Sequence, residues 1–79
     1  MPKEMLAIEA QNKFFELGML FATGREIPCD LVSAHKWFNI AAVRGDRDAV
    51  RMRAEIATEM TAADIAAAQR AAREWLSVH

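Results

Sequence analysis

Cys29, Asp30 and His35 are the residues of this sequence whose types and close spacing could support chemistry. A thiolate, a carboxylate and an imidazole are all metal ligands, and a Cys–His pair is the basis of several nucleophilic mechanisms. Two or three ligands do not close a structural zinc site, and Asp30 is already explained as a helix N-cap. A turn cysteine also needs an activating environment before it reacts. We therefore expect structural roles for these residues, with no metal, no cofactor and no catalytic residue.

A local basic cluster lies beyond the middle of the chain. Its members are Arg44, Arg47, Arg51 and Arg53. They could contact phosphates or an acidic peptide, but interspersed acidic residues dilute their charge and favour a solvated helix face. A helix-turn-helix interpretation would need base-reading side chains on the last predicted helix, which is rich in alanine. We therefore expect no nucleic-acid partner.

Length and composition describe one small globular domain. The chain has 79 residues, 53% apolar and 27% charged, with ten basic against eleven acidic residues. A near-neutral charge argues against nucleic-acid binding, and the single cysteine fits a reducing compartment. No apolar run is long enough to span a membrane, and the N-terminal stretch does not resemble a signal peptide. We expect a cytoplasmic protein without a membrane partner.

Residues that suit the starts and ends of helices occur at regular intervals, and they predict an all-α chain. Asp30, Asp46 and Thr61 suit N-cap positions, and Gly24 and Gly45 suit helix stops. The expected helices are 2–22, 31–44, 47–60 and a fourth that follows the Thr61 cap and runs to about 77. The short connections after the second and third helices make sequential neighbours antiparallel, which predicts two stacked helical hairpins.

Fourteen landmarks between residues 15 and 49 occur in a recognisable order. They are Phe15, Leu17, Gly18, Phe21, Gly24, Ile27, Asp30, Ala34, Trp37, Phe38, Ala41, Ala42, Gly45 and Ala49. With these landmarks, residues 13–48 resemble one Sel-one-like repeat, a relative of the tetratricopeptide repeat. The resemblance implies an α/α solenoid fold and an adaptor or scaffold role. It implies no catalytic residue, and its members are often bacterial.

Several landmarks also have a physical reason. Glycine costs about 1 kcal/mol relative to alanine in mid-helix, so Gly18 is best explained by a close helix crossing. Ala34, Ala41 and Ala42 would be small on the facing helix for the same reason. Trp37 and Phe38 supply large apolar area between the hairpins.

The departures from the repeat pattern concern its two ends. A small residue usually occupies the position of Lys13, because each repeat packs there against the repeat before it. A lysine at this position therefore suggests that this is a first repeat. The second unit keeps Ala49 but has Arg53 where leucine is expected. Residues 46–77 are therefore predicted to be a degenerate, capping hairpin, and residues 1–79 a single domain. On its third helix we expect an i,i+4 pair between Arg51 and Glu55.

The expected function is binding of another protein or peptide. Candidate partner-binding residues are Met5, Ile8, Phe14, Met19, Arg51 and Met52. The alternative for the Met and Phe residues is the core. The first helix is predicted to extend past its partner, with Met5, Leu6 and Ile8 either covered by the fourth helix or left for a partner. A self-associating structural or regulatory subunit, acting as a two-fold dimer, is the second hypothesis. A small enzyme or a nucleic-acid binder is a distant third.

Overall fold

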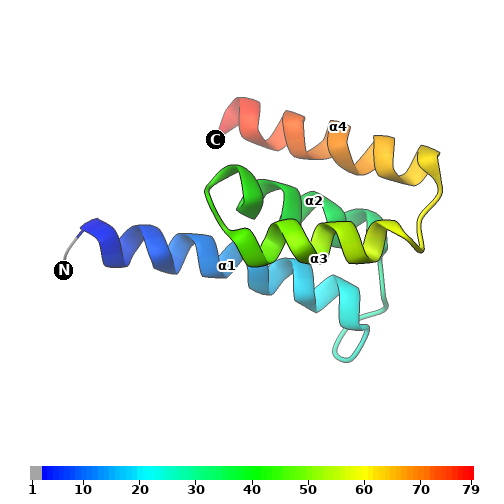
Figure 1. Cartoon of the computed structure of the whole chain (residues 1–79), viewed down its shortest axis with the longest axis horizontal. Helices are drawn as coiled ribbons and strands as arrows, with labels where there is room; N and C mark the ends of the chain where they lie inside the picture. The colour runs from blue at the N-terminus through cyan, green and yellow to red at the C-terminus, as the bar shows by residue number, and fades with distance from the viewer. Residues whose placement is uncertain (1–2) are drawn as a thin grey trace.

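Four helices and no strand make up the part of the chain that the structure describes. The computed structural model describes the backbone of residues 3–79 and the side chains of residues 13–79. The helices are α1 (Lys3–Thr23), α2 (Leu31–Val43), α3 (Arg47–Ala57) and α4 (Ala62–Val78). The all-α prediction is confirmed for these residues. Figure 1 shows α1 and α4 on opposite sides of the molecule, with α2 and α3 between them.

The predicted N-caps all form. The Asp30 carboxylate accepts a hydrogen bond from the Ser33 N–H at 3.1 Å, and the Asp46 carboxylate accepts one from the Ala49 N–H at 3.1 Å. The hydroxyl of Thr61 accepts from the N–H three residues later, also at 3.1 Å. Each cap satisfies one of the N–H groups that the first helical turn leaves without a partner.

The predicted helix stops also form at glycine. Gly24 has φ +68° and Gly45 has φ +100°, a conformation that strains residues with a Cβ. α2 therefore ends at Val43, one residue before the predicted boundary, and α3 begins two residues after Gly45.

The end of α3 differs from the prediction, because the helix stops at Ala57 and does not continue to Met60. The Thr58 hydroxyl donates to the Glu55 carbonyl at 2.7 Å. The next two N–H groups donate to carbonyls three residues earlier, which tightens the chain into a turn. A side-chain bond to the helix's own carbonyl is the competition that makes threonine a poor interior helix residue.

The core cluster joins α2 and α3 and surrounds one aromatic ring. Phe38 is fully buried, and Gly18 of α1 lies beneath its ring. The buried core cluster consists of Ala34, Phe38, Ala41, Ala49 and Ile56. The close crossing predicted at Gly18 is confirmed, and the group that uses the space is the Phe38 ring. Phe15 stacks at a tilt against it, with ring centroids 5.6 Å apart.

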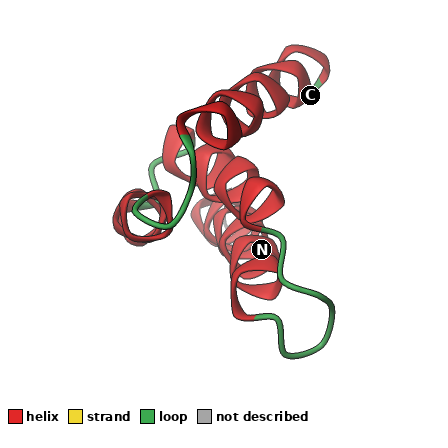
Figure 2. Cartoon of the chain, turned by 90° about the vertical axis from the view of Figure 1, so that its right-hand side faces the viewer, coloured by secondary structure: helices red, strands yellow, loops and turns green. Residues whose placement is uncertain are grey.

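The second half of the chain does not pack as the expected hairpin. α1, α3 and α4 each pack against α2, whereas α3 and α4 do not pack along each other. Figure 2 shows α4, which leads to the C-terminus, at the opposite side of the molecule from the loop that follows α1. α4 contributes the buried residues Ala68 and Ala72. α3 and α4, the two helices of the predicted capping hairpin, therefore contact α2 and not each other along their lengths.

The N-terminal part of α1 extends past the ends of the other helices in Figure 1, as the helix lengths predicted. The side chains of Met5, Leu6 and Ile8 lie outside the described residues, so their predicted roles stay predictions. Among residues 13–79, α4 meets α1 through Trp75 and Phe14 and does not pack along it. None of the described helices combines the length and the apolar character needed to cross a membrane.

Candidate protein-binding site

The C-terminal half of α1 is apolar on two sides, and only one of them faces the core. Gly18 and Phe15 lie on the side that meets α2. Leu17 and Leu20 are half-buried but do not belong to the core cluster or to the residues packed against it. At about 100° per residue, positions 13, 16 and 20 lie on the side of α1 opposite Gly18, and Leu17 lies at the edge of that side. This side therefore keeps apolar surface that the fold does not cover.

Two adjoining depressions lie over this side of α1, and we call them together the α1 groove. One has a volume of about 280 Å³ and is lined by Glu16, Met19, Leu20, Thr23, Arg25 and Glu26. The other has a volume of about 450 Å³ and is lined by Lys13, Glu16, Leu17, Leu20 and Glu26. Three residues, Glu16, Leu20 and Glu26, line both. The part of the groove that both depressions share therefore combines one leucine with two carboxylates.

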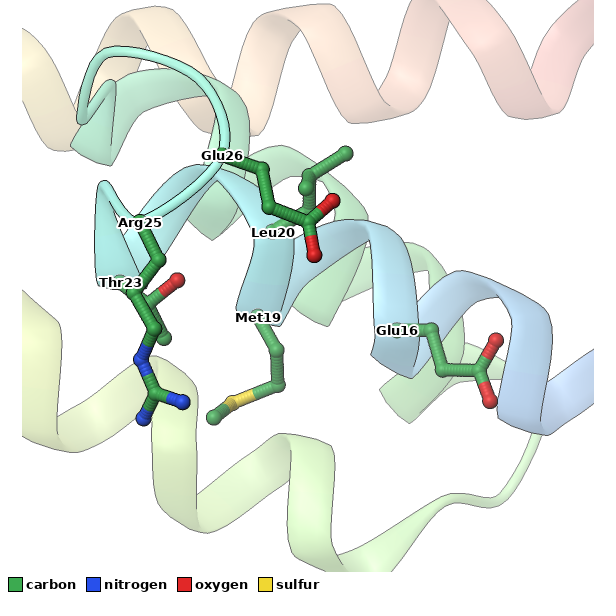
Figure 3. Close-up of a pocket in the computed structure, with 6 residues that line it drawn as sticks. All are labelled: Glu16, Met19, Leu20, Thr23, Arg25 and Glu26. Carbon is green, nitrogen blue, oxygen red and sulfur yellow. The ribbon is translucent and has the colours of Figure 1, made fainter.

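The loop after α1 forms one wall of the groove. Gly24 lets the chain turn back, and the Asp30 N–H donates to the Phe21 carbonyl at 3.0 Å. Figure 3 shows Glu26 lying beside Leu20, while Arg25 and Met19 project toward another side of α1. The backbone hydrogen bond from Asp30 to Phe21 closes the loop and so sets the positions of Arg25 and Glu26 within it.

The residues first considered for chemistry are not brought together. Cys29 is exposed in the loop and its thiol donates to the Ala22 carbonyl at 3.6 Å. Asp30 accepts from the Ser33 hydroxyl at 2.7 Å, and this bond is the main reason that the pKa of Asp30 lies below its ordinary value. His35 is buried on α2. Among residues 13–79, no group of three or more His, Cys, Asp or Glu side chains is placed to hold a metal ion.

An aromatic cluster joins α1, α2 and α4. Phe14 and Trp37 are stacked with centroids 6.0 Å apart, and the Trp75 ring meets Phe14 at 5.2 Å and Trp37 at 5.6 Å, edge-on in both cases. The sequence assigns Trp37 to packing between helices and does not predict that it meets Trp75. Helical spacing shows which face of its own helix an aromatic residue occupies, but it does not show which other helix that face contacts.

Cations and a histidine cover the faces of these rings. Lys36 Nζ lies 4.5 Å from the Trp37 centroid, and the Arg44 guanidinium carbon lies 5.3 Å from the Phe14 centroid and 5.7 Å from that of Trp75. His79 stacks flat on Trp75 at 4.3 Å, and its Nδ1 is hydrogen bonded to the Trp75 carbonyl at 2.9 Å. The cluster is consequently a partnered structural contact that holds α4 in place.

The predicted partner-binding residues fall in different places. Met19 and Met52 both pack against the core cluster, and Met19 also lines the α1 groove. Phe14 lies in the aromatic cluster. Arg51 is exposed on α3 and forms its ion pair with Asp48, one turn earlier, and not with the expected Glu55. The described members of the predicted set therefore do not form one continuous surface.

Sequence reasoning missed the outer side of α1 as a site. It treated Leu17 as a repeat-core residue and Lys13 as the mark of a first repeat. The available signal was the all-round apolar character of residues 14–21, which exceeds what one partner helix can cover. Glu26 lies in the predicted loop after the first helix, where nothing in the sequence marks it as part of a site. The loop geometry that places it over Leu20 has no counterpart in the spacing of residues.

The chain was compared with models of known protein families, with curated proteins and with solved structures. None of the three comparisons finds a match.

Proposed function

We propose that this chain is a non-catalytic protein-interaction module, an adaptor that binds an amphipathic helical segment of another protein in the α1 groove. One observation carries the proposal. Leu17 and Leu20 stay partly exposed on the side of α1 away from the core, in a groove that Glu16 and Glu26 both line. An apolar strip with charged edges is the surface that a helix laid in a groove requires.

The charges of the groove define the chemistry of the partner. Glu16 and Glu26 line both depressions, whereas Lys13 and Arg25 each line only one. The shared centre is therefore acidic. The partner segment carries apolar side chains three or four residues apart, which cover the leucines, and a lysine or arginine that meets the carboxylates.

The expected affinity is modest. Covering two half-exposed leucines contributes about 1 kcal/mol each, and an exposed ion pair adds about 0.2–1 kcal/mol. These gains must offset the loss of free motion on association. The groove therefore suits a transient contact, strengthened where a partner touches further residues.

The resemblance to a Sel-one-like repeat supports an adaptor role. What favours it is the α1–α2 pair, in which small Gly18 on α1 and Ala34 and Ala41 on α2 adjoin the buried Phe38 ring. The packing of α3 and α4 on α2, and not along each other, departs from the repeat pattern, so the support comes from the α1–α2 pair alone. The bacterial origin and the cytoplasmic location stay predictions.

The test is a titration of the isotope-labelled chain with a model peptide, followed by NMR. The probe is a helical peptide with leucines at i and i+4 and lysines beside them, and its mate carries glutamates for the lysines. We expect shift changes concentrated in residues 13–26, stronger for the lysine peptide and reduced by added salt.

Matched variants distinguish binding in the α1 groove from nonspecific binding to exposed apolar residues. The pair Leu17→Ser and Leu20→Ser removes the apolar floor without touching the core cluster. Val43→Ser changes an apolar residue on α2 that is 64% exposed and outside the groove. Binding should be lost in the first variant and kept in the second. Equal binding by all three chains, or shift changes spread over the whole surface, would refute the proposal.

A second candidate is self-association, in which a homodimer is the functional unit. The observation that favours it is the projection of the N-terminal part of α1 past the other helices in Figure 1. The sequence places Met5, Leu6 and Ile8 in that segment, and an isolated helix of this length is marginal in water unless something packs on it. Sedimentation from micromolar to millimolar concentration decides the question. A monomer mass throughout excludes the dimer and leaves the groove proposal standing.

A further inference from the structure

A polar contact lies inside the interface between α2 and α3. Arg53 of α3 donates a hydrogen bond from Nη1 to the Asn39 side-chain oxygen of α2 at 2.6 Å. His35 precedes Asn39 by four residues, so the two side chains share one face of α2. Arg53 also bears electrostatically on His35. The three side chains therefore form a small polar group beside the apolar cluster that α2 and α3 share.

His35 is the buried member of this group. His35 is only 3% exposed, and its Nδ1 has no hydrogen-bond partner among the described residues. Burial lowers the pKa of His35 below its ordinary value of 6.5, and the neighbouring Arg53 cation lowers it further. The folded chain accordingly holds the imidazole in its neutral form.

No acidic side chain among the described residues stabilises the cation of His35, and a hydrogen bond to its own backbone opposes the lowering of its pKa only in part. α1, α3 and α4 all pack against α2. From α3 the charged group that acts on the imidazole is Arg53, and from the described residues of α1 and α4 no titratable group does so. An imidazolium at this position would lie in a desolvated interface beside a guanidinium, with no carboxylate to offset either charge.

α3 is the helix least able to withstand that change. It has 11 residues, below the length at which an isolated helix is stable in water, and two of them, Ala49 and Ile56, are buried. α4 is longer and is held by the Trp75 contacts with α1 and α2. α1 packs along α2 beneath the Phe38 ring.

We propose that protonation of His35 releases α3 from α2, so that mild acid opens this side of the bundle while α1, α2 and α4 stay assembled. Release would take Ala49 and Ile56 of α3 out of the cluster that they form with Ala34, Phe38 and Ala41 of α2. The device is distinct from the α1 groove, because that groove is lined only by α1 and its following loop.

Amide hydrogen exchange between pH 7.5 and pH 5 tests the proposal, with protection corrected for intrinsic exchange. In the pH range where the released state binds a proton at His35 and the docked state does not, each unit by which the pH falls raises the opening constant of α3 about tenfold. We expect protection to fall in α3 and to hold in α1, α2 and α4. Constant protection in α3, or a simultaneous fall in all four helices, would overturn the proposal.

Variants locate the effect at His35. His35→Gln keeps a polar side chain that does not titrate in this range, so its α3 protection should not depend on pH. Arg53→Gln removes the neighbouring cation and should weaken the pH dependence, because the folded-state pKa of His35 moves toward its ordinary value. If either variant fails to fold, the imidazole proton resonances of the natural chain remain as a readout. Their titration must coincide with the loss of α3 protection, and a titration separated from that loss contradicts the proposal.

Discussion

The ring of Phe38 occupies the space that a side chain at Gly18 would need. A Cβ built on Gly18 would lie 2.5 Å from Cδ1 and Cε1 of that ring, closer than any real carbon contact. Phe38 has no exposed surface and cannot swing into solvent. The helix crossing of α1 and α2 is thus set by one missing side chain opposite one large ring.

Gly18→Ala should destabilise the fold even though alanine is the better helix former. The propensity gain is about 1 kcal/mol, while overpacking a tight core costs about 1–3 kcal/mol. We expect a net loss of about 1 kcal/mol in the free energy of unfolding, measured with urea. In a Phe38→Leu background the same change should cost less, since the ring is gone. A stabilising Gly18→Ala in the natural chain would contradict the crossing described.

Trp75→Ala should loosen α4. Full burial of a tryptophan is worth about 3–5 kcal/mol on truncation, and Trp75 is half-buried, so we expect a loss of about 2 kcal/mol. The near-ultraviolet circular dichroism of the remaining Trp37 should change as well, because its edge contact disappears. Val78→Ala, at a residue of α4 that is 75% exposed, is the control and should leave stability unchanged.

Asp30→Ala should remove the cap of α2 and cost about 1 kcal/mol. Asp30→Asn keeps the acceptor and should cost less. Hydrogen bonds from Ser33 lower the folded-state pKa of Asp30, so its contribution is present above pH 3.8 and is lost as the pH falls through the folded-state pKa. Acid unfolding of the Asn variant should lack this component. Identical acid profiles for the natural chain and the Asn variant would show that the carboxylate charge does not contribute.

A double-mutant cycle on Asn39 and Arg53 should reveal coupling. Removing one partner of a bond to a charged group costs about 1.5–3 kcal/mol, because a partly buried group loses its partner. We therefore expect Asn39→Ala and Arg53→Ala to be destabilising singly and the double variant to be less so than their sum. Strict additivity would mean that the 2.6 Å contact contributes nothing measurable.

The local features of this fold could be predicted from the sequence, since they depend on neighbouring residues. Asp30, Asp46 and Thr61 cap helices because each lies three residues before an N–H that it can reach. Gly24 and Gly45 end helices because of their own backbone freedom. Gly18 signalled a close approach through its cost in a helix, although the group that approaches it could not be named.

Contacts between distant segments were beyond the same reasoning. Arg51 has acidic neighbours at both i−3 and i+4, and spacing alone does not choose between Asp48 and Glu55. α4 packs on α2 and not on α3 because the tight turn after Ala57 redirects the chain and Trp75 finds Phe14 and Trp37. The α1 groove depends on where Glu26 lies in the loop, and no residue pattern encodes that position.

The central place of α2 has a kinetic consequence. Contacts of α2 with α1 and α3 join elements adjacent in the chain, and such local topology is associated with folding in microseconds to milliseconds. α4 alone must reach α2 across an intervening helix. α2 with its two sequence neighbours is therefore expected to form the folding nucleus, and α4 to dock afterwards. Substitutions in α4 should then accelerate unfolding while leaving the folding rate nearly constant.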